Sequence, residues 1–309
     1  MEKKVIVIGA AIMDIMGFPN KQLISYDSVP GEIHTGNGGV GRNIAENLLR
    51  LGVTTSFISA FGGDAFALQL QRSITDLKGD ISNSVFTKKG NSALHLAIMD
   101  DKNDMVAGIA AMDIIQAITP EFLAVKKEFL LSGAKIVVET NISQKSLSWI
   151  SNHIKKEQLS IDLVSIEMAQ KAKKIIGAFG TVKANRKEAA IFLERPILSE
   201  DDARLAAKIL LKKGCQNIFI TMGAEGVLSC NRKKCIITPA PKTQVASTTG
   251  AGDAFMAGVV LGQMKALPIE TCTAYGMAAA LIALESKETV SPLMNQNYLK
   301  EKIDQYFNL

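Results

Sequence analysis

The chain has 309 residues, of which 47% are hydrophobic and 21% charged, which is typical of a globular protein with an ample core. Its formal net charge of +5 arises from 35 basic and 30 acidic residues, and the basic residues occur as scattered pairs, so we expect no nucleic-acid-binding surface. The longest charge-free apolar stretch, residues 271–284, is shorter than the ~20 residues that a membrane-spanning helix needs.

The chain begins with an element typical of a buried parallel strand, because residues 5–8 are a continuous β-branched run. Apolar spacing predicts a helix over 40–51 that ends at Gly52, a strand over 54–60 and a helix over 64–75. The later strands are expected at 135–138, 159–164, 181–184 and 217–222, and the later helices at 143–155, 167–176, 187–193, 199–214, 254–265, 271–284 and 296–307.

This alternation of strands and helices predicts an α/β fold, with a mostly parallel central sheet between two layers of helices. Two segments interrupt it. Residues 17–35 contain two prolines and no helical period, and residues 92–109 read as two short strands, 94–99 and 105–109, joined by a polar turn. We therefore expect one domain over 1–309, with a small β-sheet lid built from insertions at about 15–36 and 91–112.

The cysteines are not spaced for a metal site or a disulfide framework. No CxxC pair occurs, and three histidines give no zinc-ligand spacing. Free thiols in a chain of this size fit a reducing cytoplasm, which is the location we expect. The cysteines are Cys215, Cys230, Cys235 and Cys272.

Residues 248–258, Thr-Thr-Gly-Ala-Gly-Asp-Ala-Phe-Met-Ala-Gly, are the most informative stretch of the chain. Gly250 and Gly252 bracket Ala251 at the expected start of a helix, where backbone N–H groups and a partial positive charge favour a bound phosphate. Asp253 adds a carboxylate that could accept a proton during phosphoryl transfer. A helix start with aspartate as its cap is the alternative interpretation.

A second glycine cluster occurs at residues 36–43, Gly-Asn-Gly-Gly-Val-Gly-Arg-Asn. It lacks the lysine and hydroxyl of a P-loop, and the polar residues 30–35 before it are not the buried strand that a dinucleotide site requires. Backbone donors at Gly38 and Gly39 and the amide of Asn43 suit sugar hydroxyls. Asp14, which we place at the carboxyl end of the first strand, could accept two more hydroxyl bonds; a tight turn and a capping aspartate are the alternatives.

Two further segments follow predicted strands. Asn185 and Glu188 share one helical face, where they could face phosphate and a hydrated magnesium ion, although an N-cap with a capping-box glutamate predicts the same pair. Thr221, Gly223 and Gly226 could form a rim for nucleotide phosphates, or a plain hairpin turn.

Taken together, these motifs resemble the PfkB (ribokinase-like) family of sugar and nucleoside kinases over essentially all 309 residues. The order matches the family: GGVGRN at 38–43, N-x-x-E at 185–188, T-x-G at 221–223 and TGAGDAFMAG at 249–258. Within the family, residues 38–52, 117–123 and 141–143 are most similar to pseudouridine kinases.

The resemblance implies a ribokinase-like three-layer α/β/α sandwich with a β lid, ATP as phosphoryl donor, Mg²⁺ as cofactor and a small nucleoside or sugar as acceptor. It implies a homodimer formed through the lid. Asp253 takes the catalytic-base position, and Gly250, Ala251 and Gly252 form the anion hole. The implied sugar-binding residues are Asp14, Gly38, Gly39 and Asn43; the implied nucleotide-binding residues are Asn185, Thr221, Gly223 and Gly226, with Glu188 at the metal.

Three positions depart from the family pattern. Ile12 stands where many relatives have an asparagine two residues before the sugar-binding aspartate. Ser247 stands where some relatives have the aspartate that holds a monovalent cation, which leaves potassium activation open. Met277 stands at an asparagine position near adenine, which implies apolar packing of the base.

The implied reaction is transfer of the ATP γ-phosphoryl group to the 5′-hydroxyl of pseudouridine. Ribose, another nucleoside or a phosphosugar are the alternative acceptors. A nucleotide- or sugar-binding protein without catalysis is the alternative of another class, and Asp253 beside an intact Gly-Ala-Gly argues against it.

Overall fold

An eight-stranded sheet forms the centre of the protein in the computed structural model, which describes residues 4–102, 104–132 and 135–307. All neighbours in this sheet are parallel except at one edge, where β12 pairs with β13 and β13 with β14 in antiparallel fashion. The strands, in sheet order, are β14 (Cys235–Thr238), β13 (Val227–Cys230), β12 (Asn217–Thr221), β11 (Thr181–Asn185), β10 (Leu159–Asp162), β9 (Lys135–Glu139), β1 (Val5–Ile8) and β4 (Thr55–Ile58).

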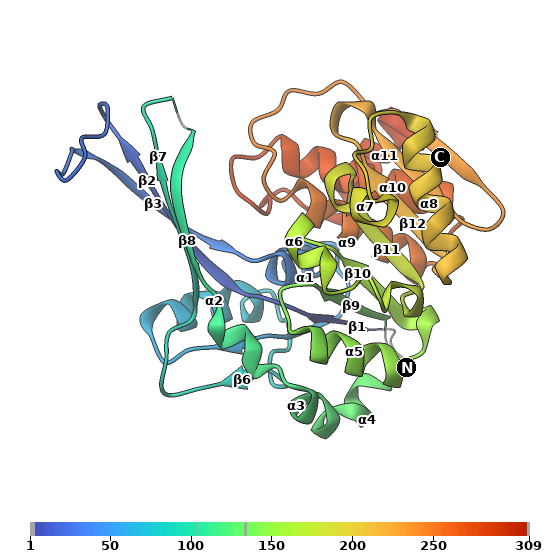
Figure 1. Ribbon diagram of the computed structural model, residues 1–309, viewed down its shortest axis with the longest axis horizontal. Helices are drawn as coiled ribbons and strands as arrows, with labels where there is room; N and C mark the ends of the chain where they lie inside the picture. Colours follow the sequence, from blue (N-terminus) through green and yellow to red (C-terminus); the bar gives the residue numbers. More distant parts are fainter. Residues whose placement is uncertain (1–3, 103, 133–134, 308–309) are drawn as a thin grey trace.

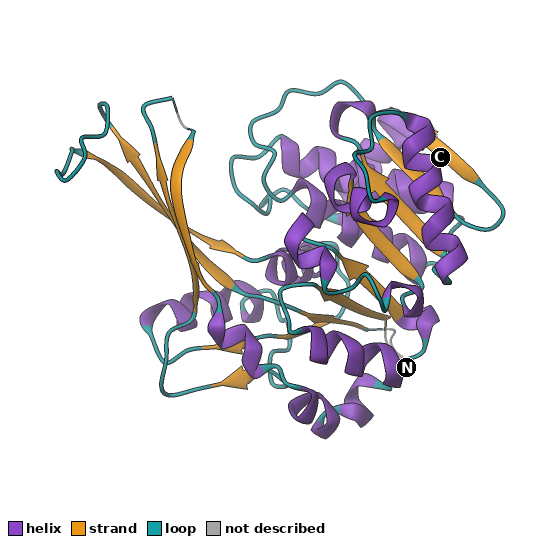
Figure 2. Ribbon diagram, viewed as in Figure 1, coloured by secondary structure: helices purple, strands orange, loops and turns teal. Residues whose placement is uncertain are grey.

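Helices cover both faces of this sheet, as Figure 2 shows. Val5 and Val7 of β1 pack into one core cluster and Ile6 and Ile8 into another, because successive side chains of a strand point to opposite faces. The cluster around Val5 and Val7 includes residues of α1 (Val40–Arg50), α2 (Ala65–Thr75), α9 (Ala251–Met264), α10 (Ile269–Leu284) and α11 (Gln296–Phe307). The cluster around Ile6 and Ile8 includes residues of α3 (Pro120–Val125), α4 (Lys127–Leu130), α5 (Gln144–His153), α6 (Ile166–Gln170), α7 (Arg186–Leu193) and α8 (Glu200–Lys213).

The three-layer α/β/α architecture predicted from the sequence is therefore confirmed. The Ser143 and Ser199 side chains cap α5 and α8 as expected, and α8 ends at Gly214, which has a φ of 115°. The strand expected over 54–60 is interrupted after Ile58: β5 (Ala60–Phe61) leaves the main sheet and pairs with β6 (Val85–Phe86). No helix in the described part of the chain is both long and apolar enough to cross a bilayer.

A second sheet, which we call the lid sheet, stands out from this body at the upper left of Figure 1. Its order is β3-β2-β7-β8, and the two strands expected over 94–99 and 105–109 are both present. The strands are β2 (Ile12–Pro19), β3 (Gly31–Gly38), β7 (Ala93–Met99) and β8 (Met105–Ala111).

The lid sheet corrects two expectations. Asp14 does not lie at the end of β1: that strand stops at Ile8, and the chain pairs again from Ile12, which places Asp14 on β2 opposite Gly36 and His95. The polar segment before the second glycine cluster is also a strand, since residues 31–35 belong to β3. Because most of β3 is exposed and pairs in antiparallel fashion with β2, it is still not the buried parallel strand of a dinucleotide site.

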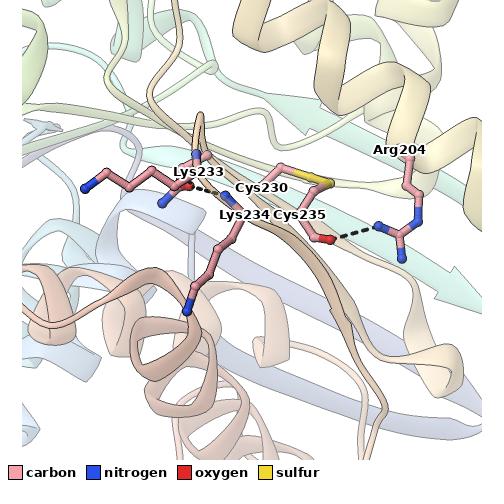
Figure 3. Close-up of a disulfide and its surroundings, with 6 residues drawn as sticks. Arg204, Cys230, Lys233, Lys234 and Cys235 are labelled. Atoms are coloured by element: carbon pink, nitrogen blue, oxygen red, sulfur yellow. Dashed lines mark hydrogen bonds between the residues drawn. A yellow bond between two sulfur atoms is a disulfide. The ribbon is translucent and has the colours of Figure 1, made fainter.

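The expectation of free thiols is wrong for two of the cysteines. Cys230 and Cys235 occupy opposite positions on β13 and β14 and form a disulfide, shown in Figure 3. Arg204 of α8 donates a hydrogen bond of 2.9 Å from Nη1 to the Cys235 carbonyl. A search for CxxC spacing misses this pair, because the tight antiparallel turn between the two cysteines sets their distance. Cys215 and Cys272 are free and buried.

Candidate active site

The predicted site residues gather at the carboxyl edge of the central sheet. From β1 the chain proceeds to β4 on one side of the sheet, and from β9 it proceeds through β10, β11 and β12 on the other side. The strand order therefore reverses between β1 and β9, and α/β proteins bind ligands at such a reversal point. Glu139, at the end of β9, bridges this reversal point by accepting hydrogen bonds from the backbone N–H groups of Ala10 (2.5 Å) and Asn141 (2.6 Å). The carboxylate thus holds the chain leaving β1 beside the end of β9.

Helix α9 begins at this edge with the sequence that suggested an anion site. Gly250 is the N-cap, with a φ of 80°, and a Cβ there would lie 1.9 Å from the Thr289 carbonyl oxygen, so only glycine fits. The first N–H groups of a helix have no partner within the helix, and Ala251 and Gly252, which carry two of them, line a cavity of about 770 Å³.

Asp253 is the third residue of α9, and its side chain is held from α1. It is 8% exposed, and its Oδ2 accepts a hydrogen bond of 2.7 Å from Nδ2 of Asn43. Burial raises the pKa of Asp253 to about 7 and the Asp162 carboxylate adds to the increase, whereas Lys183, Asn43 and Arg42 lower it. A carboxyl group with a pKa near neutrality is well matched to accept a proton at physiological pH.

A buried ion pair stands next to the start of α9. Nζ of Lys183 on β11 lies 2.9 Å from Oδ2 of Asp162 at the end of β10, and a Cβ on Gly252 would lie 2.9 Å from the same Nζ. Burial lowers the pKa of Lys183, but the carboxylates of Asp162, Glu188 and Asp253 outweigh this effect and raise it above its usual value. The ammonium group therefore stays charged beside the start of α9.

The cavity contains most of the predicted nucleotide site. Thr221, Gly223 and Gly226 line it, together with Ala251 and Gly252. Its remaining wall is largely apolar and comes from α9, α10 and residues 240–248; it includes Phe255, Met277 and Leu281. The combination of backbone N–H groups at one side and an apolar surface at the other suits a nucleotide, with phosphate at the helix start and the base on the apolar wall.

Asn185 and Glu188 do not line this cavity and instead form a complete capping box at the start of α7. Asn185 Oδ1 accepts from the Glu188 N–H, and the Glu188 carboxylate accepts from the Asn185 N–H (2.8 Å) and Nδ2 (2.6 Å). The capping interpretation of this pair is therefore confirmed. Within residues 4–102, 104–132 and 135–307, no group of three or more His, Cys, Asp or Glu side chains could hold a metal ion.

The predicted sugar-binding residues lie where the lid sheet meets α1. Asp14 Oδ1 is 3.5 Å from Nδ1 of His95 on the neighbouring strand, and a Cβ on Gly38 would lie 1.9 Å from Asp14 Oδ2. Gly39 is the N-cap of α1, and Asn43 follows in its first turn. Asn43 thus joins the two predicted subsites, since it belongs to the sugar-binding group and its amide contacts Asp253.

Sequence reasoning missed several charged residues of the site. Arg42 stands at the position of a P-loop lysine, and it is buried beside Asn43. Glu139 and Asp162 end β9 and β10, Lys183 is the middle residue of β11, and most other residues of these strands are buried. A charged side chain within an otherwise buried strand was the available signal, because such groups are almost always paired.

Comparison with known proteins agrees with this geometry. Residues 2–296 match the pfkB family of carbohydrate kinases. The pseudouridine kinase of Escherichia coli strain K12 is 30% identical, with 93% of this chain and 92% of the relative covered, and the Arabidopsis thaliana pseudouridine kinase is 25% identical, with 93% and 92% covered. Ribokinase of Arabidopsis thaliana, solved with ribose and ATP, superposes with a TM-score of 0.88 at 18% identity, over 98% of this chain and 99% of that chain.

Proposed function

The chain belongs to the pfkB family of carbohydrate kinases, and we propose that this ATP-dependent kinase phosphorylates the 5′-hydroxyl of pseudouridine. The choice of acceptor is supported by the similarity to two pseudouridine kinases over most of their length. The observation that carries the catalytic part is the place of Asp253: a buried carboxylate in the first turn of α9, between the nucleotide cavity lined by Gly252 and the sugar-side residue Asn43.

In the proposed reaction, the Asp253 carboxylate takes the proton of the 5′-hydroxyl as that oxygen bonds to the γ-phosphorus of ATP. The bond from the γ-phosphorus to the β,γ-bridging oxygen breaks, and ADP leaves. Since phosphoryl transfer has a loose transition state, alignment and charge stabilisation supply most of the acceleration. The N–H groups of residues 250–253 and the ammonium of Lys183 lie where the charge of the transferred group would be stabilised.

ATP would occupy the cavity beside α9, with its phosphates at Gly223, Gly226 and Gly252 and its base near Met277. Magnesium keeps most of its ligands from water and phosphate in such sites, and when bound it would neutralise phosphate charge. Both oxygens of Glu188 already accept hydrogen bonds from Asn185, so we propose that Glu188 meets the ion through water only.

The lid sheet supplies Asp14 to the acceptor site, and Asp14, Gly38 and Gly39 would hold the sugar hydroxyls. Strand β8 at the edge of this sheet exposes Met105, Val106 and Ile109 by 60%, 60% and 67%. An apolar edge strand of this kind favours pairing with another copy, so we propose a homodimer through the lid sheet, which size-exclusion chromatography with light scattering would detect. A cytoplasmic location, where ATP is supplied, completes this proposal.

The test is an ATP-consumption assay with pseudouridine, uridine, adenosine, ribose and fructose 6-phosphate as acceptors. Pseudouridine should give the highest kcat/KM, and mass spectrometry should find the phosphate on the 5′-oxygen. Asp253→Asn should lower kcat by about 10²–10⁴, which is the usual contribution of a general base, while ATP still binds.

The outcomes separate the parts of the proposal. Faster turnover of another acceptor would replace pseudouridine while leaving the kinase assignment intact. ATP binding without turnover of any acceptor would favour a non-catalytic binding protein. An Asp253→Asn variant that keeps more than about a hundredth of the wild-type kcat would remove Asp253 from the role of base.

A further inference from the structure

Arg42, in the first turn of α1, is the largest polar side chain that the fold buries completely, with 1% of its surface exposed. All three guanidinium nitrogens have partners. Nε donates to the Gly38 carbonyl (3.0 Å) and Nη2 to the Asn37 carbonyl (2.7 Å), while Nη1 donates to Glu46 and Nη2 also to Oδ1 of Asn43. A buried arginine with this many contacts has a fixed position, and the contact with Asn43 has a chemical consequence.

The guanidinium decides which way the Asn43 amide faces. Arginine has donors only, so the group turned toward it must be the amide oxygen of Asn43. The amide nitrogen then faces Asp253 and donates to its carboxylate over 2.7 Å. If the amide turned over, its NH₂ would meet the guanidinium and its oxygen would meet the carboxylate, and both contacts would be repulsive.

We propose that Arg42 is a positioning residue for phosphoryl transfer: it locks the amide of Asn43 so that the NH₂ group always donates to the carboxylate of Asp253. This inference rests on the proposed function, in which Asp253 is the base. One oxygen of the carboxylate is held by Asn43, which leaves the other to accept the proton of the acceptor hydroxyl. Because Arg42 also holds the Gly38 carbonyl, the same side chain links the base to the sugar-binding turn.

The charged groups around Asp253 come from three elements. Lys183 on β11 and Arg42 on α1 lower its pKa together with the Asn43 amide, whereas Asp162 on β10 raises it. Loss of Arg42 removes a positive charge and also frees the amide to turn its oxygen toward the carboxylate. Both changes disfavour the ionised form of Asp253, so a smaller fraction of this carboxyl group is ionised and able to accept a proton near neutral pH.

The carboxylate of Glu46 compensates the buried charge of Arg42, and its second partner, Arg50, provides a control. The Glu46 carboxylate is bound by Arg42 at one oxygen and by Arg50 at the other, with Arg50 Nε donating over 2.9 Å. Arg50 is one helical turn beyond Glu46, and among the described residues no hydrogen bond or ion pair joins it to Asn43 or Asp253. A variant at Arg50 therefore disturbs the same ion-pair cluster without touching the amide that faces the base.

The experiment compares kcat against pH for the wild type, Arg42→Met and Arg50→Met, with saturating ATP and the best acceptor from the assay above. We expect Arg42→Met to lower kcat by about 10- to 100-fold near pH 7, as the loss of a charge-assisted hydrogen bond implies. The acid limb of its profile should move upward by about one pH unit. Arg50→Met should keep both the kcat and the acid limb of the wild type.

A double-mutant cycle tests whether Arg42 acts through Asn43. Arg42→Met should add little to the kcat loss of Asn43→Ala, because the amide is then already absent. An acid limb of Arg42→Met that coincides with the wild type, or full additivity with Asn43→Ala, would overturn the inference and leave Arg42 with a structural role only.

Two further measurements keep the test decisive. If Arg42→Met does not fold, the double variant Arg42→Met/Glu46→Gln takes its place in every comparison, because it also removes the buried carboxylate that would be left with Arg50 as its remaining partner. A ¹³C NMR titration of labelled aspartate carboxyls, with Asp253 assigned by its absence in Asp253→Asn, follows its pKa without turnover. A pKa unchanged by loss of Arg42 overturns the inference, whereas an active Asp253→Asn enzyme contradicts the base assignment under the proposed function instead.

Discussion

The buried carboxyl of Asp253 should make the stability of the protein depend on pH in a predictable direction. Burial raises its pKa from the ordinary 3.8 to about 7. A carboxyl whose pKa is raised by folding contributes stability while it is protonated, and this contribution is complete below about pH 4 and lost as the pH rises toward 7. Asp253→Asn removes the titration, because the amide stays neutral at every pH.

The size of the effect follows from the pKa shift. Each pKa unit corresponds to about 1.4 kcal/mol, so the ionised Asp253 destabilises the fold by about 4 kcal/mol above pH 7. At pH 5 the destabilisation is smaller by about 3 kcal/mol. At this pH Asp253 is still protonated in the folded state, so the fold does not have to bury an ionised carboxylate; only the ionisation of the unfolded state counts against folding. The stabilisation of Asp253→Asn over the wild type should therefore be about 3 kcal/mol larger at pH 8 than at pH 5.

Urea unfolding of both proteins at pH 5 and pH 8, followed by circular dichroism, measures this difference. The exposed Asp304 of α11 offers a matched control, because Asp304→Asn should change stability by less than about 0.5 kcal/mol at either pH. An equal stabilisation by Asp253→Asn at both pH values would refute the reasoning, since it would mean that folding does not desolvate this carboxyl.

Three other changes test separate parts of the site. Gly250→Ala should lower both kcat and stability, the latter by more than about 1 kcal/mol, because its φ is 80° and the Thr289 carbonyl would clash; unchanged thermal unfolding would contradict this. Ala280→Phe should fill part of the cavity beside α9, where we propose that ATP binds, and raise the KM for ATP at least tenfold with little effect on the acceptor KM, as steady-state kinetics would show. Glu139→Gln replaces one of two accepting oxygens with an NH₂ group, and its free energy of unfolding at pH 8 should fall by about 1–3 kcal/mol; a loss below about 0.5 kcal/mol would argue against the bridge.

The fold was largely predictable because local signals and tertiary packing agree. The β-branched run of β1, the caps at Ser143 and Ser199 and the glycine after α8 all occur where the sequence predicts them. The strands around Asp14 were harder: an apolar run continuous with β1 gives no sign that the chain leaves one sheet and enters another. Cys230 and Cys235 were missed for a related reason, because their pairing depends on strand register rather than spacing.

The sequence by itself determined the chemistry that this protein has available. A glycine-bracketed helix start, an aspartate within its first turn and a second glycine cluster before an asparagine are local features, and each depends on backbone geometry that neighbouring residues set. Only the tertiary structure decided which of these groups meet. Asn43 and Asp253 are 210 residues apart and become hydrogen-bonded because α1 and α9 pack on the same face of the sheet, and the buried charges of Arg42 and Lys183 acquire their roles from partners that no local pattern could reveal.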